Sequence, residues 1–167
     1  MSSNIINLLW ESFLETILMV GVSGGLGAAI GIPLGVFLFV TSPKGIMPKP
    51  YVNRIIGTVV NAVRSTPFII LLVAIIPFTR LIVGSSIVPL TIAAAPLIAR
   101  LVETSLREVD KGLIEAAQSM GATNTQIICK VLIPEAMPGI LAGLTIAFVA
   151  LVGSSAMAGA VGGGGLG

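Results

Sequence analysis

Long uncharged stretches divide this chain. Residues 16–43, 81–99 and 136–167 carry no charged side chain, in runs of 28, 19 and 32 residues, and the stretch 55–79 contains only Arg64. About 20 predominantly apolar residues in a helix span the hydrocarbon core of a bilayer. The pattern therefore predicts four membrane helices. Their expected bounds are about 14–40, 55–78, 82–104 and 136–160.

Composition supports a membrane rather than an aqueous environment. Of the 167 residues, 55% are apolar and 10% are charged, whereas a soluble domain has about 25% charged residues. Mean hydropathy is +1.08. The 20 Gly and ten Pro mostly lie within or beside the apolar runs, as membrane helices tolerate. The expected fold is an all-α polytopic membrane protein with one transmembrane domain over residues 1–167.

Several kinds of chemistry are excluded by the residues that the sequence lacks. It has no His, one Cys (Cys129) and one Asp (Asp110), so a His general base, a His/Cys metal cluster and an internal disulfide are excluded. No GxxxxGK[ST] phosphate loop is present. We therefore expect no catalytic site, no metal site and no cofactor bound by this chain.

Basic residues predict the orientation in the membrane. The segment 41–54 holds three Lys or Arg and the segment 100–130 holds four, whereas the first 15 residues hold none and the turn near residue 80 holds one. Because cytoplasmic loops are enriched in Lys and Arg, we expect these two basic segments inside and the N-terminus outside. The chain stops at 162–167, a Gly-rich run without a polar tail. We therefore expect a C-terminal truncation and at least one further helix.

The segment 108–134 carries the most specific signal. Leu113, Ala116, Ala117 and Met120 follow a helical i, i+3, i+4, i+7 spacing, and Gly121 interrupts it. The first helix here has about ten residues and is only about 15 Å long, too short to cross a bilayer. It suits docking into a groove of a partner protein. An amphipathic connector lying on lipid is the alternative.

The same residues resemble the EAA loop of binding-protein-dependent ABC importer permeases, whose pattern is E-A-A-x3-G-x9-I-x-L-P. Glu115-Ala116-Ala117, Gly121 and Pro134 match it, while Val131 and Ile133 replace the usual Ile and Leu by other apolar residues. Further segments resemble the permeases of methionine importers most, and the resemblance covers essentially the whole chain. These segments are 41–45 (TSPKG), 63–80 (VRSTPFIILLVAIIPFTR) and 131–138 (VLIPEAMP).

The resemblance implies an ATP-driven methionine importer in a bacterial cytoplasmic (inner) membrane. Two permease copies form the pathway, two cytoplasmic ATPase subunits bind ATP and Mg, and an external solute-binding protein, often a lipoprotein, delivers the amino acid. The short helix of the EAA loop sits in a cleft on the ATPase. The implied ATPase-coupling residues are Glu115, Ala116, Ala117, Met120, Gly121 and Pro134, with Pro134 at the start of the next membrane helix.

We expect a second set of residues either to line the pathway or to be structural. It comprises Arg64, Ser65, Pro67, Ser154, Ser155 and Met157. An arginine within an apolar run usually faces protein or water. Arg64 could therefore meet a substrate carboxylate, or play a structural part by pairing with Glu103, Glu135 or backbone carbonyls. The small residues around Ser154 and Ser155 could line a pathway or simply pack closely.

Three other functions remain open. One is the same machinery importing another amino acid or small solute. Another is an ATPase-independent secondary transporter or channel, which would have no need of an ATPase-docking helix. The third is a membrane scaffold protein without transport. The spaced glycines Gly27, Gly31 and Gly35 permit close helix contact, either within the chain or between two copies.

Overall fold

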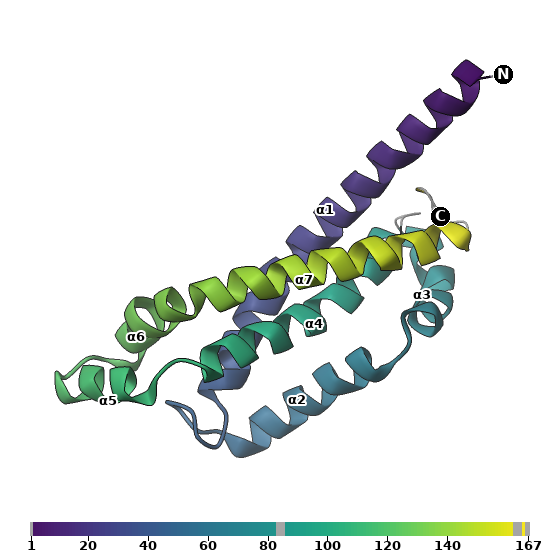
Figure 1. Cartoon of the computed structure of the whole chain (residues 1–167). Helices are drawn as coiled ribbons and strands as arrows, with labels where there is room; N and C mark the ends of the chain where they lie inside the picture. Colours follow the sequence, from purple (N-terminus) through teal and green to yellow (C-terminus); the bar gives the residue numbers. More distant parts are fainter. Residues whose placement is uncertain (1, 83–85, 162–164, 166–167) are drawn as a thin grey trace.

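A computed structural model describes residues 2–82, 86–161 and 165, with side chains at these positions except 2–4, 76 and 78–82. Every regular element in these ranges is helical (Figure 1). The elements are α1 (Ser2–Val40), α2 (Pro50–Ser65), α3 (Phe68–Ile82), α4 (Ile87–Arg107), α5 (Lys111–Ser119), α6 (Asn124–Ile127), the π-helix η1 (Ile128–Leu132) and α7 (Ile133–Ala160).

Three stretches are long and apolar enough to cross a membrane, namely Ile5–Val40, Ile87–Arg107 and Asn124–Ala160. The third includes α6, η1 and α7. α2 and α3 meet the same criteria only when they are taken together, as one span that bends by 96° between them. The described residues therefore contain three membrane-crossing helices, or four if this bent pair is one span.

The bend replaces the continuous helix expected over 55–78. Thr66 is extended, with φ −78° and ψ 126°, and its backbone N–H donates to the Val63 carbonyl. Pro67 explains the break, because a proline disfavours helical geometry at the preceding residue and has no N–H of its own.

Other helix bounds also differ from the expected ones. α1 begins at Ser2 rather than near residue 14, and α7 continues directly from η1 instead of starting near 136. α4 ends at Arg107, a few residues beyond the expected 104. Residues 83–85, at the expected start of this helix, and most of the Gly-rich 162–167 lie outside the described residues.

α4 is the central helix, lying between α1, α7 and α2 (Figure 1). Its contact with α1 is very close. A Cβ added to Gly31 would lie 2.8 Å from the Ala95 carbonyl oxygen, and one added to Gly35 would lie 2.5 Å from the Ala99 carbonyl oxygen. Gly27 and Gly31 therefore serve packing within the chain, as does Gly35. On the other side of α4, a Cβ at Gly143 of α7 would lie 3.0 Å from the Leu101 Cβ.

The loop 41–49, α5 and α6 gather at one end of the molecule, whereas the N-terminus and α3 lie at the other (Figure 1). Asn53 connects the start of α2 to the end of α1 by hydrogen bonds. Its side-chain amide donates to the Leu38 carbonyl at 2.6 Å and to the Thr41 Oγ1 at 3.0 Å. The basic segments 41–54 and 100–130 therefore share one end of the helix bundle.

We predict that Gly31→Ala destabilises the chain by about 1–3 kcal/mol, the usual cost of forcing extra atoms into a packed interface. The added methyl group would press on α4 backbone, which cannot rotate away as a side chain can. Gly25→Ala is the matched control, because a Cβ there meets nothing within 4 Å. Thermal unfolding of the detergent-purified protein measures both variants. Equal melting temperatures for the two would contradict the packing account.

Candidate functional site

α5 begins at a side-chain cap. Asp110 is extended, and its Oδ1 accepts a hydrogen bond of 2.8 Å from the Gly112 backbone N–H. Such a cap satisfies one of the N–H groups that the first turn of a helix leaves unpaired. Asp110 was not among the expected site residues, although Asp before a helical pattern is a recognised start signal.

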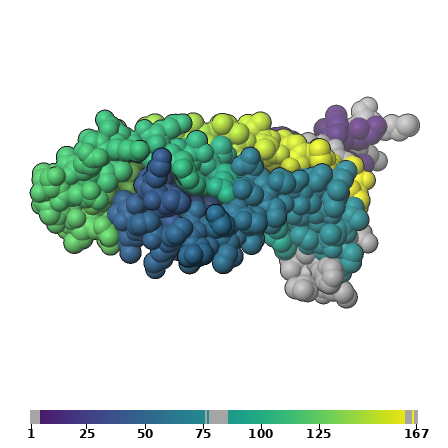
Figure 2. Space-filling model, turned by 90° about the horizontal axis from the view of Figure 1, so that it is seen from below, coloured from purple at the N-terminus to yellow at the C-terminus, as the bar shows by residue number. Residues whose placement is uncertain are grey.

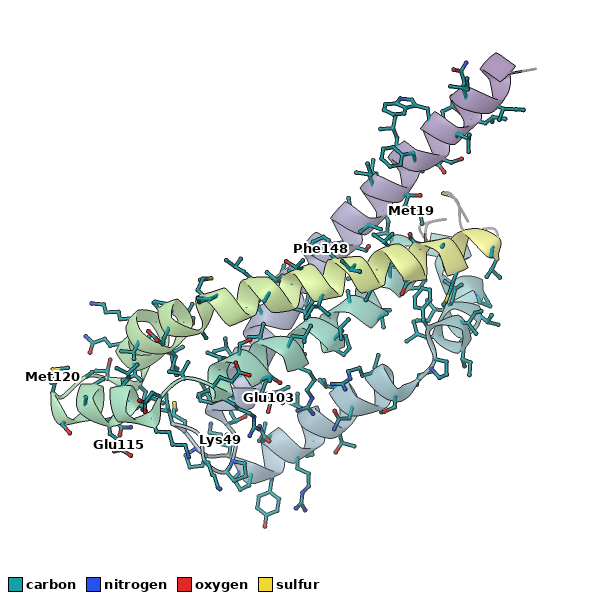
Figure 3. All side chains as sticks on the ribbon, in the orientation of Figure 1. Met19, Lys49, Glu103, Glu115, Met120 and Phe148 are labelled. Atoms are coloured by element: carbon teal, nitrogen blue, oxygen red, sulfur yellow. The ribbon has the colours of Figure 1, made fainter. Side chains whose placement is uncertain are left out.

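The four residues with helical spacing on α5 divide between two environments. Leu113 and Ala116 are exposed and Met120 is 81% exposed, whereas Ala117 is only 4% exposed and belongs to the chain's own core. Glu115 is also exposed, and Figure 3 shows Glu115 and Met120 at the tip of the molecule. Ala117 therefore holds α5 against the bundle, and it does not share the free surface as the helical spacing suggested.

Gly121 ends α5 with a defined turn. Its φ is +79°, its N–H donates to the Gln118 carbonyl at 2.9 Å, and the Ala122 N–H donates to the Ala117 carbonyl at 3.1 Å. This pair of bonds is the Schellman motif, which favours glycine at the left-handed position. Since a Cβ at Gly121 would meet nothing within 4 Å, the backbone conformation, not crowding, accounts for the glycine.

The chain then turns back toward the membrane helices. Thr123 and Gln126 form a reciprocal capping box at the start of α6. The π-helix η1 follows and continues directly into α7, whose second residue is Pro134. α5 contacts η1. A displacement of α5 would therefore reach the base of α7 both along the chain and through this contact.

A hollow of about 380 Å³ separates α5 from the loop after α1 and from the end of α4. Its lining includes both signs of charge, with Lys44, Arg107 and Lys111 near Glu115. Lys111, Ile114, Glu115 and Gln118 form its α5 side. This end of the molecule therefore has a hollow lined by polar and charged side chains, next to the exposed apolar surface of Leu113 and Met120.

Glu103 is a buried acid in α4. It is 3% exposed and lies between Arg100 at 2.5 Å and Arg107 at 2.6 Å. The Arg100 guanidinium also donates to the Gly57 carbonyl of α2 at 2.9 Å. A buried carboxylate needs such partners, because an unpaired buried charge is very costly. The cluster thereby links α2 to α4. The only signal of this cluster in the sequence is that Arg100, Glu103 and Arg107 are each about one helical turn apart.

Arg64, Ser65 and Pro67 lie around the bend between α2 and α3, and all three are exposed. Glu103, one of the partners considered for Arg64, is occupied by Arg100 and Arg107. Arg64 stands in the last turn of α2, where a cation interacts favourably with the helix dipole.

Ser154, Ser155 and Met157, the α7 residues expected to line the pathway or to be structural, differ in environment. Ser155 is buried, and its hydroxyl donates to the Val152 carbonyl at 2.8 Å. Ser154 is half-buried and donates to the Ala150 carbonyl, while Met157 is exposed. The Ser155 hydroxyl is thus satisfied by its own helix inside the bundle, an arrangement typical of close packing.

Curated relatives match the chain over nearly its whole length. A probable D-methionine transport system permease protein MetI of Vibrio cholerae is 56% identical over 167 residues, covering 96% of this chain and 74% of the relative. The D-methionine transport system permease protein MetI of Escherichia coli K12 is 53% identical, covering 95% and 76%. A methionine import system permease protein MetP of Bacillus subtilis is 48% identical, covering 95% and 74%.

Solved structures match as well. The native crystal form of the inward-facing MetNI methionine ABC transporter aligns with a TM-score of 0.95 and 53% identity, covering all of this chain and 80% of that one. An amino acid ABC transporter with histidines, at 21% identity and a TM-score of 0.78, shares the fold. Residues 31–167 match the family model described as binding-protein-dependent transport system inner membrane component, and the chain belongs to that family.

Proposed function

We propose that this chain is the membrane-spanning subunit of an ATP-driven methionine importer, forming the translocation pathway and coupling it to a cytoplasmic ATPase. The observation that supports methionine as the substrate is the 53–56% identity, along nearly the whole chain, to permease proteins of D-methionine transport systems. Another amino acid or small solute is the alternative substrate. A secondary transporter or channel is the alternative from another class.

The coupling surface is the exposed part of α5 and the turn after it. Leu113, Ala116 and Met120 offer apolar contact, and Glu115 adds a charge beside them. Short apolar helices of this kind dock into grooves on partner proteins. Ala117 anchors α5 from behind and Gly121 sets the turn, so both act by positioning this surface. Pro134 lies further along, at the base of α7.

The partners follow from this role. The complex comprises a second copy of the chain, two cytoplasmic ATPase subunits and an external solute-binding protein. ATP and Mg belong to the ATPase subunits, and this chain binds neither. ATP binding in the partner biases two arrangements of the membrane helices, open to one side or the other. α5 transmits this bias through its contact with η1, since η1 leads directly into α7.

The proposed orientation places the loop 41–49 and α5 in the cytoplasm and the N-terminus outside. Positive residues favour the cytoplasmic side, and the end of the molecule with this loop and α5 includes Lys44, Lys49 and Lys111 (Figure 1). An ATPase that uses cytoplasmic ATP must meet α5 on that same side. The positions of the basic residues and the need for α5 to meet the ATPase thus support the same orientation.

This orientation predicts the labelling of single cysteines by an impermeant thiol reagent added outside intact cells. Met47 and Thr123 are exposed at the α5 end, and Asn7 is exposed near the N-terminus. In a Cys129→Ser background, Met47→Cys and Thr123→Cys should stay unlabelled until the cells are opened. Asn7→Cys should react at once. The reverse pattern would invert the proposed topology.

Gly121→Val should abolish coupling without removing the protein from the membrane. A non-glycine residue in the left-handed region costs about 1–2 kcal/mol, and more for a β-branched one. That cost lowers the ratio of correctly placed to misplaced α5 by roughly 5- to 30-fold. Cells with the complete transport system should take up radiolabelled methionine, and Gly121→Val should lose most of this uptake. Membrane abundance and co-purification of the ATPase are measured on the same cells.

Gly121→Asn is the matched control, because asparagine tolerates the left-handed region. Its uptake should stay near that of the unsubstituted protein. Full uptake by Gly121→Val would contradict the coupling role. Methionine uptake that continues after ATP depletion and follows an ion gradient would instead support the secondary-transporter alternative.

A further inference from the structure

α2 carries a stripe of polar side chains along one face. Arg54, Thr58, Asn61 and Ser65 are spaced by four, three and four residues, which places them on one side of a helix. All four are exposed. At 1.5 Å per residue the stripe is about 16 Å long, roughly half the thickness of the hydrocarbon core.

The rest of α2 shows that this stripe is a separate face. Gly57 and Val60, buried in the chain, lie on another side, where the Arg100 guanidinium binds the Gly57 carbonyl. Ile55 and Val59 are exposed on a third side, at four-residue spacing, and Ala62 extends that side. α2 therefore exposes two surfaces of opposite character. The apolar one suits lipid, whereas a stripe with an amide and a guanidinium does not.

The polar stripe borders a hollow. A cavity of about 540 Å³ is lined by Arg54, Thr58 and Asn61 of this stripe and by Arg100 of α4. Other α2 residues, among them Asn53 and Gly57, complete its α2 side. The lining residues among the described part of the chain include no Asp or Glu. Figure 2 shows α2 (blue) uncovered by other elements on this face of the molecule. The hollow thus offers neutral and cationic hydrogen-bonding groups to whatever fills it.

The end of the stripe coincides with the break in the helix. Ser65 is the last residue of α2, and the 96° bend follows at Thr66 and Pro67. Non-helical backbone at membrane depth is tolerated only where it is buried in protein or lines a water-filled cavity. Ser65 and Pro67 are exposed in this chain. The break and the stripe therefore indicate water on the same side of α2.

We propose that the face of α2 formed by Arg54, Thr58, Asn61 and Ser65 is a wall of the water-filled translocation pathway. This inference rests on the proposed function and names the part of the pathway that the chain supplies. Hydroxyl and amide groups replace water around a small zwitterionic solute, and Arg54 meets its carboxylate at the end next to the loop 41–49. The lining has no carboxylate for the solute's ammonium group, so the solute is held weakly and passes on.

Cysteine accessibility along α2 tests the proposal in the assembled transporter. Single cysteines replace Thr58, Asn61 and Ser65 on the polar face, and Ile55, Val59 and Ala62 on the apolar face, in a Cys129→Ser background. All six positions are exposed in the chain, so none of the substitutions removes core packing. The reagent is a small water-soluble methanethiosulfonate applied to opened membrane vesicles. Because only thiolates in water react, the polar-face cysteines should react roughly tenfold faster or more.

Excess methionine should slow the reaction of Asn61→Cys and leave Val59→Cys unchanged. Equal rates on the two faces, or faster reaction on the apolar face, would overturn the proposal. Methionine uptake by the Cys129→Ser parent separates the two levels of inference. If the parent takes up methionine but the polar-face cysteines do not react faster than the apolar-face ones, the assignment of the pathway wall is wrong and the proposed function stands. If the parent shows no ATP-dependent methionine uptake, the proposed function is wrong.

Discussion

Close contact between helices with little side-chain volume between them is the constraint on which this structure depends. Lipid is as apolar as the helix surfaces, so association within a bilayer relies on tight packing and hydrogen bonding rather than on expulsion of water. Gly31 and Gly35 allow α1 to approach the backbone of α4, and Gly143 allows α7 to approach from the other side. α4 is held between them and positions the elements at its end.

Polar contacts at the end of α4 convert this packing into a defined mechanical connection. Glu103 joins Arg100 and Arg107, and Arg100 reaches the α2 backbone at Gly57. α5 follows α4 after three residues, with Asp110 capping its start and Ala117 buried against the bundle. α5 is thus attached to α4 by a short linker and to α7 through η1. A partner that moves α5 acts on two membrane helices together.

Local sequence signals predicted the helical class, the short helix after residue 110 and a special role for Gly121, because hydrophobic periodicity and glycine report on local backbone. The break at Pro67 replaced a helix expected to be continuous, since the 96° bend depends on how α3 packs against α4 and α7. The burial of Ala117 could not be read from spacing, since a helical stripe does not say which edge faces the core. Nor did the sequence decide between Arg64 and the helix neighbours Arg100 and Arg107 as the partners of Glu103.

Photo-crosslinking from α5 tests the central claim most directly, because the account requires this helix to touch the ATPase. A photoreactive amino acid at Met120, which is 81% exposed, is compared with one at Trp10, which is 62% exposed at the far end of α1. Irradiation of intact cells should crosslink the ATPase subunit to the Met120 variant and not to the Trp10 variant. An ATPase adduct from Trp10 with none from Met120 would contradict the account.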